Sequence, residues 1–190
     1  MIGRRYSKKR AAHRGFSLIE LMMVISILSL ISSIVMASMV TARERAREAK
    51  AKVEMRQIIE VTLVATGENN TTVIGITEPN HLEPSQSTAE CLGWGEVEPY
   101  DEGGPCYDAW KHMALELGSH SDNFIAADTF FISFKFDPWG TPYIIHERQG
   151  LYGHEDTCDD HDEIKSAGAD RIHGTDDDVS MEIPLSSSCP

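Results

Sequence analysis

The chain has 190 residues and carries 17 lysine and arginine residues against 30 acidic residues, for a formal net charge of −13. The charge is segregated: the first 15 residues hold six basic groups and no acid, whereas after Arg56 five basic residues stand against 26 acids. Because nucleic acid is a polyanion that this acidic part would repel, it is not an expected partner. The apolar run after the basic start argues against a cytosolic enzyme.

Residues 16–40 form an apolar run whose one ionisable group is Glu20. As a helix, this run is long enough to cross a hydrocarbon core of about 30 Å. The basic residues before it favour a cytoplasmic N-terminus, although the second basic cluster at 43–56 weakens that asymmetry. A cleaved secretory signal peptide fits less well, because its apolar region has about 7–15 residues and ends at a small-residue cleavage site.

Glu20 is costly in this position. A carboxylate deep in an apolar helix costs about 2.5–3.5 kcal/mol on insertion scales, so it normally has a partner. No lysine or arginine lies within reach on the same helix. Glu20 is therefore either protonated or snorkelling near the interface, or it pairs with a positive charge from another molecule. An α-amino group made by cutting the chain just before the run would supply that charge.

Residues 14–20 read Arg-Gly-Phe-Ser-Leu-Ile-Glu, directly before the apolar run. This pattern resembles the class III signal of type IV pilins and of type II secretion pseudopilins. The resemblance implies that prepilin peptidase cuts between Gly15 and Phe16 and that the new amino group of Phe16 is methylated. It also implies that Glu20 pairs with the Phe16 amine of a neighbouring subunit as a filament grows.

Residues 16–66 contain neither glycine nor proline, so nothing in the sequence breaks a helix there. The sequence predicts a membrane-spanning half at 16–40 and an amphipathic half at 41–66, which Gly67 is expected to end. The apolar side of the second half is expected to pack against a globular head. Its members are Ala42, Ala46, Ala49, Val53, Ile58, Ile59 and Leu63.

The rest of the chain predicts a small α+β head. Residues 67–128 look like a variable insert with one short helix around 108–117, and no chemistry is assigned to them. A few short antiparallel strands packed on the long helix are expected to form the head at 129–190. The strand candidates are 130–136, 143–147, 163–166 and 179–184, with a turn at 137–140 between the first two.

A second set of motifs lies in this head. Residues 137–143 read Asp-Pro-Trp-Gly-Thr-Pro-Tyr, 166–170 read Ser-Ala-Gly-Ala-Asp, and 174–179 are acidic. These motifs resemble those of the major pseudopilin of type II secretion. The resemblance covers about 15–64 and 136–183 and leaves the central insert unmatched. It implies a Ca²⁺ site held by the side chains of Asp170, Asp177 and Asp178 and by oxygens near Ala167 and Thr175.

The residue chemistry leaves alternatives to calcium. Hard oxygen ligands on a glycine-bearing loop suit Ca²⁺, but the EF-hand spacing is absent and a solvated acidic turn needs no metal. A zinc site at His154, Cys158 and His161 is weaker, because structural zinc sites usually pair two ligand elements. A catalytic role for Cys158 and His161 lacks a nucleophile elbow and an oxyanion hole.

Four cysteines lie beyond the apolar run, in the part expected in the periplasm, where oxidising conditions favour disulfides. Four cysteines allow three pairings, and pairing of sequence neighbours is favoured. The favoured pairs are Cys91 with Cys106 and Cys158 with Cys189.

The resemblance implies a non-enzymatic subunit that polymerises into the periplasmic pseudopilus of a type II secretion system and supports export of folded proteins across the outer membrane. The implied partners are further copies of the chain, prepilin peptidase, minor pseudopilins, the inner-membrane assembly platform and, before assembly, membrane lipid. With leader 1–15 removed, the chain would cross the inner membrane once and hold its head in the periplasm. Two alternatives are a type IV pilin for adhesion, motility or DNA uptake, and a membrane-anchored periplasmic binding module with a coincidental leader.

Overall fold

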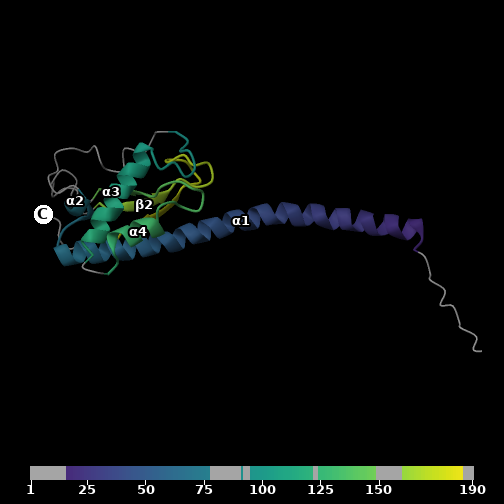
Figure 1. Ribbon diagram of the computed structural model, residues 1–190, viewed down its shortest axis with the longest axis horizontal. Helices are drawn as coiled ribbons and strands as arrows, with labels where there is room; N and C mark the ends of the chain where they lie inside the picture. Colours follow the sequence, from purple (N-terminus) through teal and green to yellow (C-terminus); the bar gives the residue numbers. More distant parts are fainter. Residues whose placement is uncertain (1–15, 78–90, 92–94, 122–123, 149–159, 186–190) are drawn as a thin grey trace, which may run out of the picture. The chain divides into compact units, whose positions relative to one another are not determined.

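The computed structural model describes residues 16–77, 91, 95–121, 124–148 and 160–185. The chain divides into two compact units, Met1–Ala42 and Arg43–Pro190. Helix α1 (Leu18–Asn69) contributes its apolar first part to one unit and its second part to the other (Figure 1). In the described residues, the second unit, called the head below, also contains three shorter helices and a three-stranded sheet.

The first part of α1 is apolar on all sides. Its large side chains are exposed, from Leu18 at 75% to Val40 at 64%. Its serines satisfy their hydroxyl groups within the helix: Ser26 Oγ donates to the carbonyl of Met22 and Ser29 Oγ to that of Ile25, both at 2.8 Å. By length and composition α1 can cross a membrane, with a mean hydropathy of 2.4 in its most apolar 18-residue window.

The second part of α1 buries only part of the expected apolar face: Ile58 and Ile59 are buried as predicted, whereas Leu63 is 37% exposed. Ala42, Ala46 and Ala49 are exposed, and Val53 is 52% exposed, so the prediction that these residues pack on the head is wrong. The larger apolar side chains lie on an adjacent side and bury more area, so that side faces the core. The buried residues of this helix are Ala51, Met55, Ile58, Ile59, Val61, Thr62, Ala65 and Thr66.

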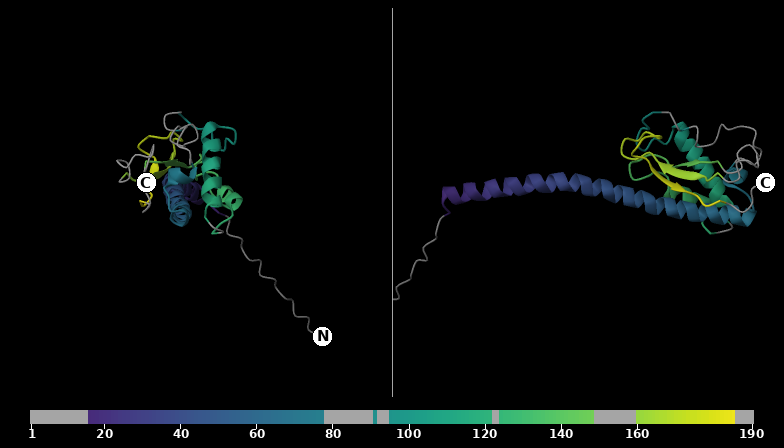
Figure 2. Two further views of the ribbon diagram at one scale, coloured as in Figure 1. Left: turned by 90° about the vertical axis from the view of Figure 1, so that its left-hand side faces the viewer. Right: turned by 180° about the vertical axis from the view of Figure 1, so that it is seen from behind.

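The segment 67–128 contributes two helices to the head. Helix α2 (Val73–Thr77) is short, and α3 (Pro105–Ser119) begins with Pro105, which suits the first helical turn because that turn needs no backbone donor. Trp110 and Leu117 of α3 are fully buried in the main hydrophobic core. Figure 2 shows α3 and the sheet beside the second part of α1. This segment is therefore part of the core of the head.

The aromatic run expected as a strand at 130–136 is a helix, α4 (Ala127–Ser133), so that prediction is wrong. Phe130 and Phe134 are both buried, with ring centroids 5.3 Å apart, whereas Ile132 is 69% exposed. A strand would place these three residues on one side, while a helix turns Ile132 away. The Trp110 Nε1–H donates to the carbonyl of Phe134 at 2.8 Å, which ties the end of α4 to α3.

Three antiparallel strands form the sheet, in the order β1 (Ile144–His146), β2 (Glu163–Ser166) and β3 (Val179–Glu182). Ile145 pairs with Ile164, and Ile164 with Met181, on the side of the sheet that faces the core. These strands lie within the predicted ranges 143–147, 163–166 and 179–184. The long N-terminal helix with this small sheet confirms the expected α+β class in a pilin-like arrangement.

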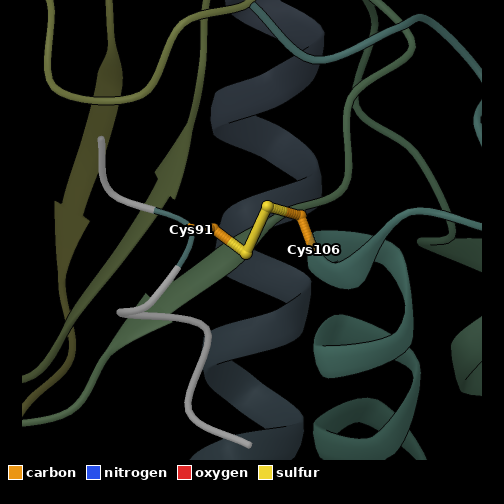
Figure 3. The surroundings of a disulfide bond; sticks show 2 residues. All are labelled: Cys91 and Cys106. Atoms are coloured by element: carbon orange, nitrogen blue, oxygen red, sulfur yellow. A yellow bond between two sulfur atoms is a disulfide. The ribbon is translucent and has the colours of Figure 1, made fainter. Parts of the chain in front are cut away.

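A disulfide joins Cys91 to Cys106, the nearer of the two pairs favoured from the sequence (Figure 3). The two Cα atoms lie 5.4 Å apart and are separated by 15 residues of sequence. Both cysteines are buried against Ile144, on the side of the sheet away from the main core. The bond therefore fastens the first turn of α3 to the segment at Cys91, and both cysteines pack against β1 through Ile144. Cys158 and Cys189 lie outside the described residues.

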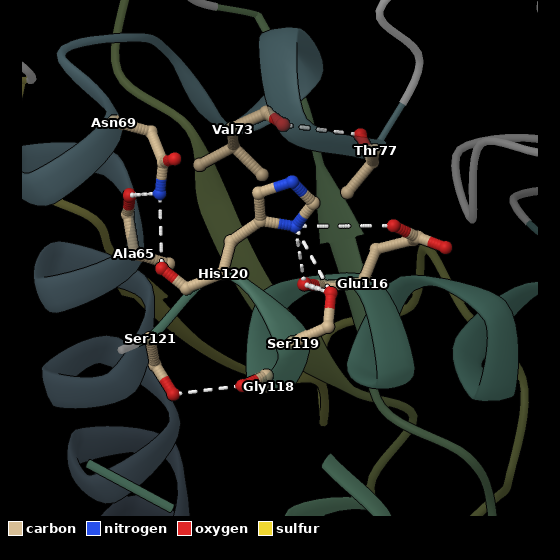
Figure 4. A network of polar contacts seen from close by, with 9 residues as sticks. All are labelled: Ala65, Asn69, Val73, Thr77, Glu116, Gly118, Ser119, His120 and Ser121. Carbon is tan, nitrogen blue, oxygen red and sulfur yellow. Dashed lines mark hydrogen bonds and ion pairs between the residues drawn. The ribbon is translucent and has the colours of Figure 1, made fainter. Parts of the chain in front are cut away.

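Helix α1 ends at Asn69, so Gly67 lies within the helix rather than ending it. Asn70 has φ of 50°, the left-handed conformation that asparagine tolerates better than most residues and that commonly ends helices. The Asn69 side chain donates to the carbonyls of Ala65 at 2.8 Å and His120 at 2.9 Å (Figure 4). These bonds tie the end of α1 to the end of α3.

The turn 137–140 is built around the buried carboxylate of Asp137. Its Oδ1 accepts the backbone N–H groups of Trp139 at 2.9 Å and Thr141 at 2.8 Å. Its Oδ2 accepts the hydroxyls of Thr141 at 2.6 Å and Ser166 at 2.5 Å. Burial raises the pKa of Asp137, although these hydrogen bonds oppose the shift. At the same turn Gly140 has φ of +92°, and a Cβ there would lie 3.0 Å from the Tyr100 ring.

Replacing Asp137 with alanine is expected to destabilise the head by roughly 2–4 kcal/mol, because buried donors lose their acceptor. Urea unfolding of residues 43–190 measures the free energy of unfolding. Asp160→Ala is the control, because Asp160 is exposed; a change within about 0.5 kcal/mol is expected for it. Equal stabilities of the two variants would show that the Asp137 hydrogen bonds do not stabilise the head.

Candidate functional site

The N-terminal motif lies at the start of α1. Gly15 is outside the described residues, and Phe16 is 81% exposed just before the helix. The Ser17 backbone N–H donates to Glu20 Oε2 at 2.9 Å. Because α1 begins at Leu18, Ser17 is its N-cap and Glu20 its third residue, which is the acidic half of a capping box. Glu20 therefore has a helix-capping role in its own chain.

The sequence prediction for Glu20 missed this capping role. The signal was present as a serine followed three residues later by a glutamate, directly before an apolar helix. Within the described residues the Glu20 carboxylate accepts this one hydrogen bond. Because a carboxylate has two oxygens with four lone-pair sites, it can accept a further donor while the cap stays intact.

The acidic loop follows β2 and returns to β3. Ala167 is buried at the end of β2, Thr175 and Asp178 are half-buried, and Asp170 and Asp177 are exposed. Thus all five predicted calcium ligands lie on one loop between two paired strands. Gly168 permits the close return of the chain: it has φ of +67°, and a Cβ there would lie 2.3 Å from the Asp177 carbonyl oxygen.

The loop orients its carboxylates with its own donors. Asp177 Oδ2 accepts the backbone N–H groups of Ala169 at 2.8 Å and Asp170 at 3.0 Å, and Asp177 Oδ1 accepts the Thr175 hydroxyl at 2.7 Å. Partial burial raises the pKa of Asp177, but these hydrogen bonds outweigh it and leave that pKa below its usual range. Asp178 Oδ2 accepts the Gly174 N–H at 2.8 Å. Burial, with a contribution from the Asp177 charge, raises the pKa of Asp178.

The acidic loop offers oxygen donors of the kind that bind hard cations. Carboxylate, hydroxyl and carbonyl oxygens are the ligands that Ca²⁺ takes, so the donor set suits a hard cation. Among the described residues no group of three or more histidine, cysteine or acidic side chains converges on one point. His154 and Cys158 of the alternative zinc site lie outside the described residues, and His161 is exposed. The loop therefore has suitable ligands but not an assembled cluster of side chains.

His173 is buried in the same loop, with 4% of its surface exposed. Within the described residues neither of its ring nitrogens has a hydrogen-bond partner. Burial, together with the nearby Lys165 charge, lowers the pKa of His173 to about 4, and Asp170 opposes the shift. No pattern in the sequence marks this histidine, because its burial depends on how the loop folds over it.

Acid is expected to destabilise the head through His173. Its pKa falls from an ordinary 6.5 to about 4 on folding, so the unfolded chain binds the proton more readily between these values. Proton uptake by His173 in the unfolded chain does not affect the free energy of unfolding above pH 6.5. As the pH falls toward 4, it lowers that free energy by an amount on the order of 2–3 kcal/mol. Urea unfolding of residues 43–190 at about pH 7.5 and about pH 4.5 spans this range. The free energy of unfolding should depend less on pH for His173→Leu than for wild type.

His161→Gln serves as the control for this measurement, because His161 is exposed. It should keep the pH dependence of the wild-type fragment. An unchanged pH dependence in His173→Leu would contradict a neutral, buried His173.

The comparisons with known proteins bear on the N-terminal motif. The family model described as "Prokaryotic N-terminal methylation motif" matches residues 10–36. This range includes Gly15, Phe16, Glu20 and the first part of α1. No curated protein and no solved structure matches the chain.

The chain thus carries a type IV pilin-like prepilin signal near its N-terminus. This signal indicates a pilin-like substrate of prepilin peptidase and implies pilus-like polymerisation. It points to a structural protein rather than an enzyme. Together with the apolar helix, it is consistent with a membrane-anchored, pilus-like protein.

Proposed function

We propose that this chain is the major pseudopilin of a type II secretion system, a subunit that polymerises into the periplasmic pseudopilus and supports export of folded proteins across the outer membrane. The observation that carries the proposal is the prepilin motif at 10–36 on a helix whose apolar side chains are exposed. Such a large apolar surface requires cover. Lipid would cover it before assembly and neighbouring copies afterwards.

The turn motif supports a pseudopilin over a type IV pilin. The Trp139 Nε1–H donates to Glu44 Oε2 at 2.9 Å, and the Tyr143 hydroxyl donates to Glu54 Oε2 at 2.6 Å. Burial, with the neighbouring Glu54 carboxylate, raises the pKa of Tyr143, so the phenol stays a donor. Residues that carry the resemblance to the major pseudopilin therefore hold the head on α1. A type IV pilin is the second candidate, because the N-terminal motif is common to both.

Location and partners follow from the same proposal. The disulfide between Cys91 and Cys106 fits an oxidising compartment such as the periplasm. The chain would cross the inner membrane once, with its head on the periplasmic side. Its partners would be further copies of itself, prepilin peptidase, minor pseudopilins and the inner-membrane assembly platform. Genes for a secretin, an ATPase and minor pseudopilins beside this one would favour the pseudopilin over the pilin.

Two substitutions of Glu20 separate its two roles. Glutamine can still accept the Ser17 N–H but carries no charge, whereas alanine removes both the cap and the charge. If Glu20 neutralises the Phe16 amine of a neighbouring copy, both Glu20→Gln and Glu20→Ala should be inserted and cleaved yet lose most filament, by about tenfold or more. The measurement is the amount of sheared filament relative to processed subunit in the membrane.

Gly15 provides the control for processing in that experiment. Gly15→Val should remain uncleaved and form no filament, because the prepilin motif places the cut directly after this glycine. Wild-type filament from Glu20→Gln together with loss in Glu20→Ala would assign Glu20 to capping alone. Unchanged processing and function of Gly15→Val would contradict the assembly hypothesis.

We also propose that the acidic loop binds Ca²⁺ through Asp170, Asp177 and Asp178, with oxygens near Ala167 and Thr175. The four carboxylates of this loop, with Asp176, repel one another without a cation. Burial is the main cause of the raised pKa of Asp178, and the Asp177 charge adds to it. Bound calcium would relieve the repulsion and hold β3 against β2.

Calcium is expected to raise the melting temperature of residues 43–190 relative to EGTA. At a Kd of order 10⁻⁴ M, typical of weak extracytoplasmic sites, a hundredfold excess stabilises by about 2.7 kcal/mol. Asp170→Ala and Asp177→Ala should abolish the calcium-dependent rise, while Asp160→Ala should keep it. No shift in the wild-type fragment would exclude the site, and a shift with zinc alone would favour His154, Cys158 and His161.

A further inference from the structure

One side of α1 carries basic side chains that the head does not cover. Arg45, Lys52 and Arg56 are exposed, and their spacing of seven and four residues places them within a sector of about 40°. We call these three residues the basic face. Lys52 pairs with Glu48 on the same helix, whereas Arg45 and Arg56 form no ion pair within the part of the chain that the structure describes.

This basic face creates a problem for polymerisation. It begins five residues after the apolar run 16–40, so packing the apolar runs of many copies brings their basic faces close together. Like charges repel unless carboxylates lie between them. The negative charges of lipid headgroups cannot neutralise the whole basic face. Arg56 lies about 24 Å along the helix from Val40, whereas headgroups extend only about 5–8 Å beyond the hydrocarbon core.

The head carries a surface of complementary charge and shape. A hollow of about 180 Å³ beside the start of α3 is lined by apolar side chains and carboxylates. Glu96 pairs with Arg171, whereas Glu98 and Asp101 are exposed and form no ion pair among the described residues. Its apolar lining includes Pro105, Tyr107 and Pro142, and its acidic lining consists of Glu96, Glu98 and Asp101. We call this site the acidic hollow.

The acidic hollow is held in shape by its surrounding contacts. Tyr100, between two of its carboxylates in sequence, has φ of 60°, a strained conformation for a bulky residue. Its backbone N–H donates to the Gly140 carbonyl at 2.8 Å, and its ring packs edge-on against Phe136 at 5.4 Å between centroids. The Asp101 carboxylate accepts the Gly103 N–H at 2.9 Å. The backbone between Glu98 and Asp101 and the Asp101 carboxylate are therefore held in place within the chain itself.

We propose that in the filament the basic face of one copy docks against the acidic hollow of a second copy. An arginine suits the hollow, because its guanidinium pairs with carboxylates while its aliphatic stem lies on apolar walls. The two charged surfaces belong to one compact unit but do not pair within it, so their pairing requires another copy. The exposed stripe of Ala42, Ala46, Ala49 and Val53 beside the basic face allows close approach. This inference rests on the proposed function, since it needs a polymer.

Charge reversal in the full-length chain tests the docking. Arg45→Glu with Arg56→Glu reverses the basic face, Glu98→Lys with Asp101→Lys reverses the hollow, and a fourfold variant reverses both. Each double variant should lose about tenfold or more of the sheared filament, because like charges then meet. The fourfold variant should recover to within about threefold of wild type. Lys111→Glu is the matched control, because Lys111 is exposed on α3 without an ion pair in the described residues.

Processing at Gly15 and the Cys91–Cys106 disulfide, measured in the same samples, show that each variant is inserted and folded. Wild-type amounts of filament from the variant with a charge-reversed hollow would show that the acidic hollow is not the partner. If only the variant with a charge-reversed basic face then lost filament, the basic face would instead contact anionic lipid or another surface. Failure of the fourfold variant to recover, with both doubles folded, would also overturn the docking. If the wild-type chain makes no filament, the proposed function itself fails; wild-type filament with unaffected variants rejects only the docking.

Discussion

The buried carboxylate of Asp137 connects the parts of the head that must stay together. It accepts hydrogen bonds from the turn itself and from Ser166 at the end of β2, where the acidic loop begins. The same turn presents Trp139 to Glu44 on α1. A carboxylate this deeply buried is tolerated because its acceptor sites are filled by fixed donors. The Asp137 side chain thus connects the turn to the sheet, and the turn contacts α1 through Trp139. The acidic loop begins directly after Ser166, which is one of the hydrogen-bond partners of Asp137.

Charge and apolarity divide the chain into sections with different surroundings. The apolar run suits lipid or copies of itself, the basic section after it suits an anionic surface, and the head carries most of the acids. In an isolated soluble protein this arrangement would leave a large apolar surface uncovered and two charged surfaces unpaired. In a polymer each section can meet a complementary section of a neighbour, which is why assembly explains the distribution better than catalysis does.

Glu20 caps its own helix and, under the proposed function, would also pair with a neighbouring copy in the polymer. As the third residue of α1 it caps the helix through the Ser17 N–H, which orders the first turn of the helix next to the expected cleavage position. Its free lone pairs leave room for a second donor. A carboxylate that is already oriented by the cap would lose less conformational freedom on binding a neighbouring amine, so the cap is compatible with the proposed pairing.

The sequence by itself determined the N-terminal motif, the apolar helix, the α+β class and three of the four predicted strands, because these follow from local spacing and composition. It did not determine which side of α1 is buried, the helical state of 127–133, or the burial of His173. Those features depend on competition between surfaces far apart in the sequence. Burying Met55 and Ile58 removes more apolar area from water than burying the alanine stripe would. The helix at 127–133 likewise allows Phe130 and Phe134 to be buried together in the core.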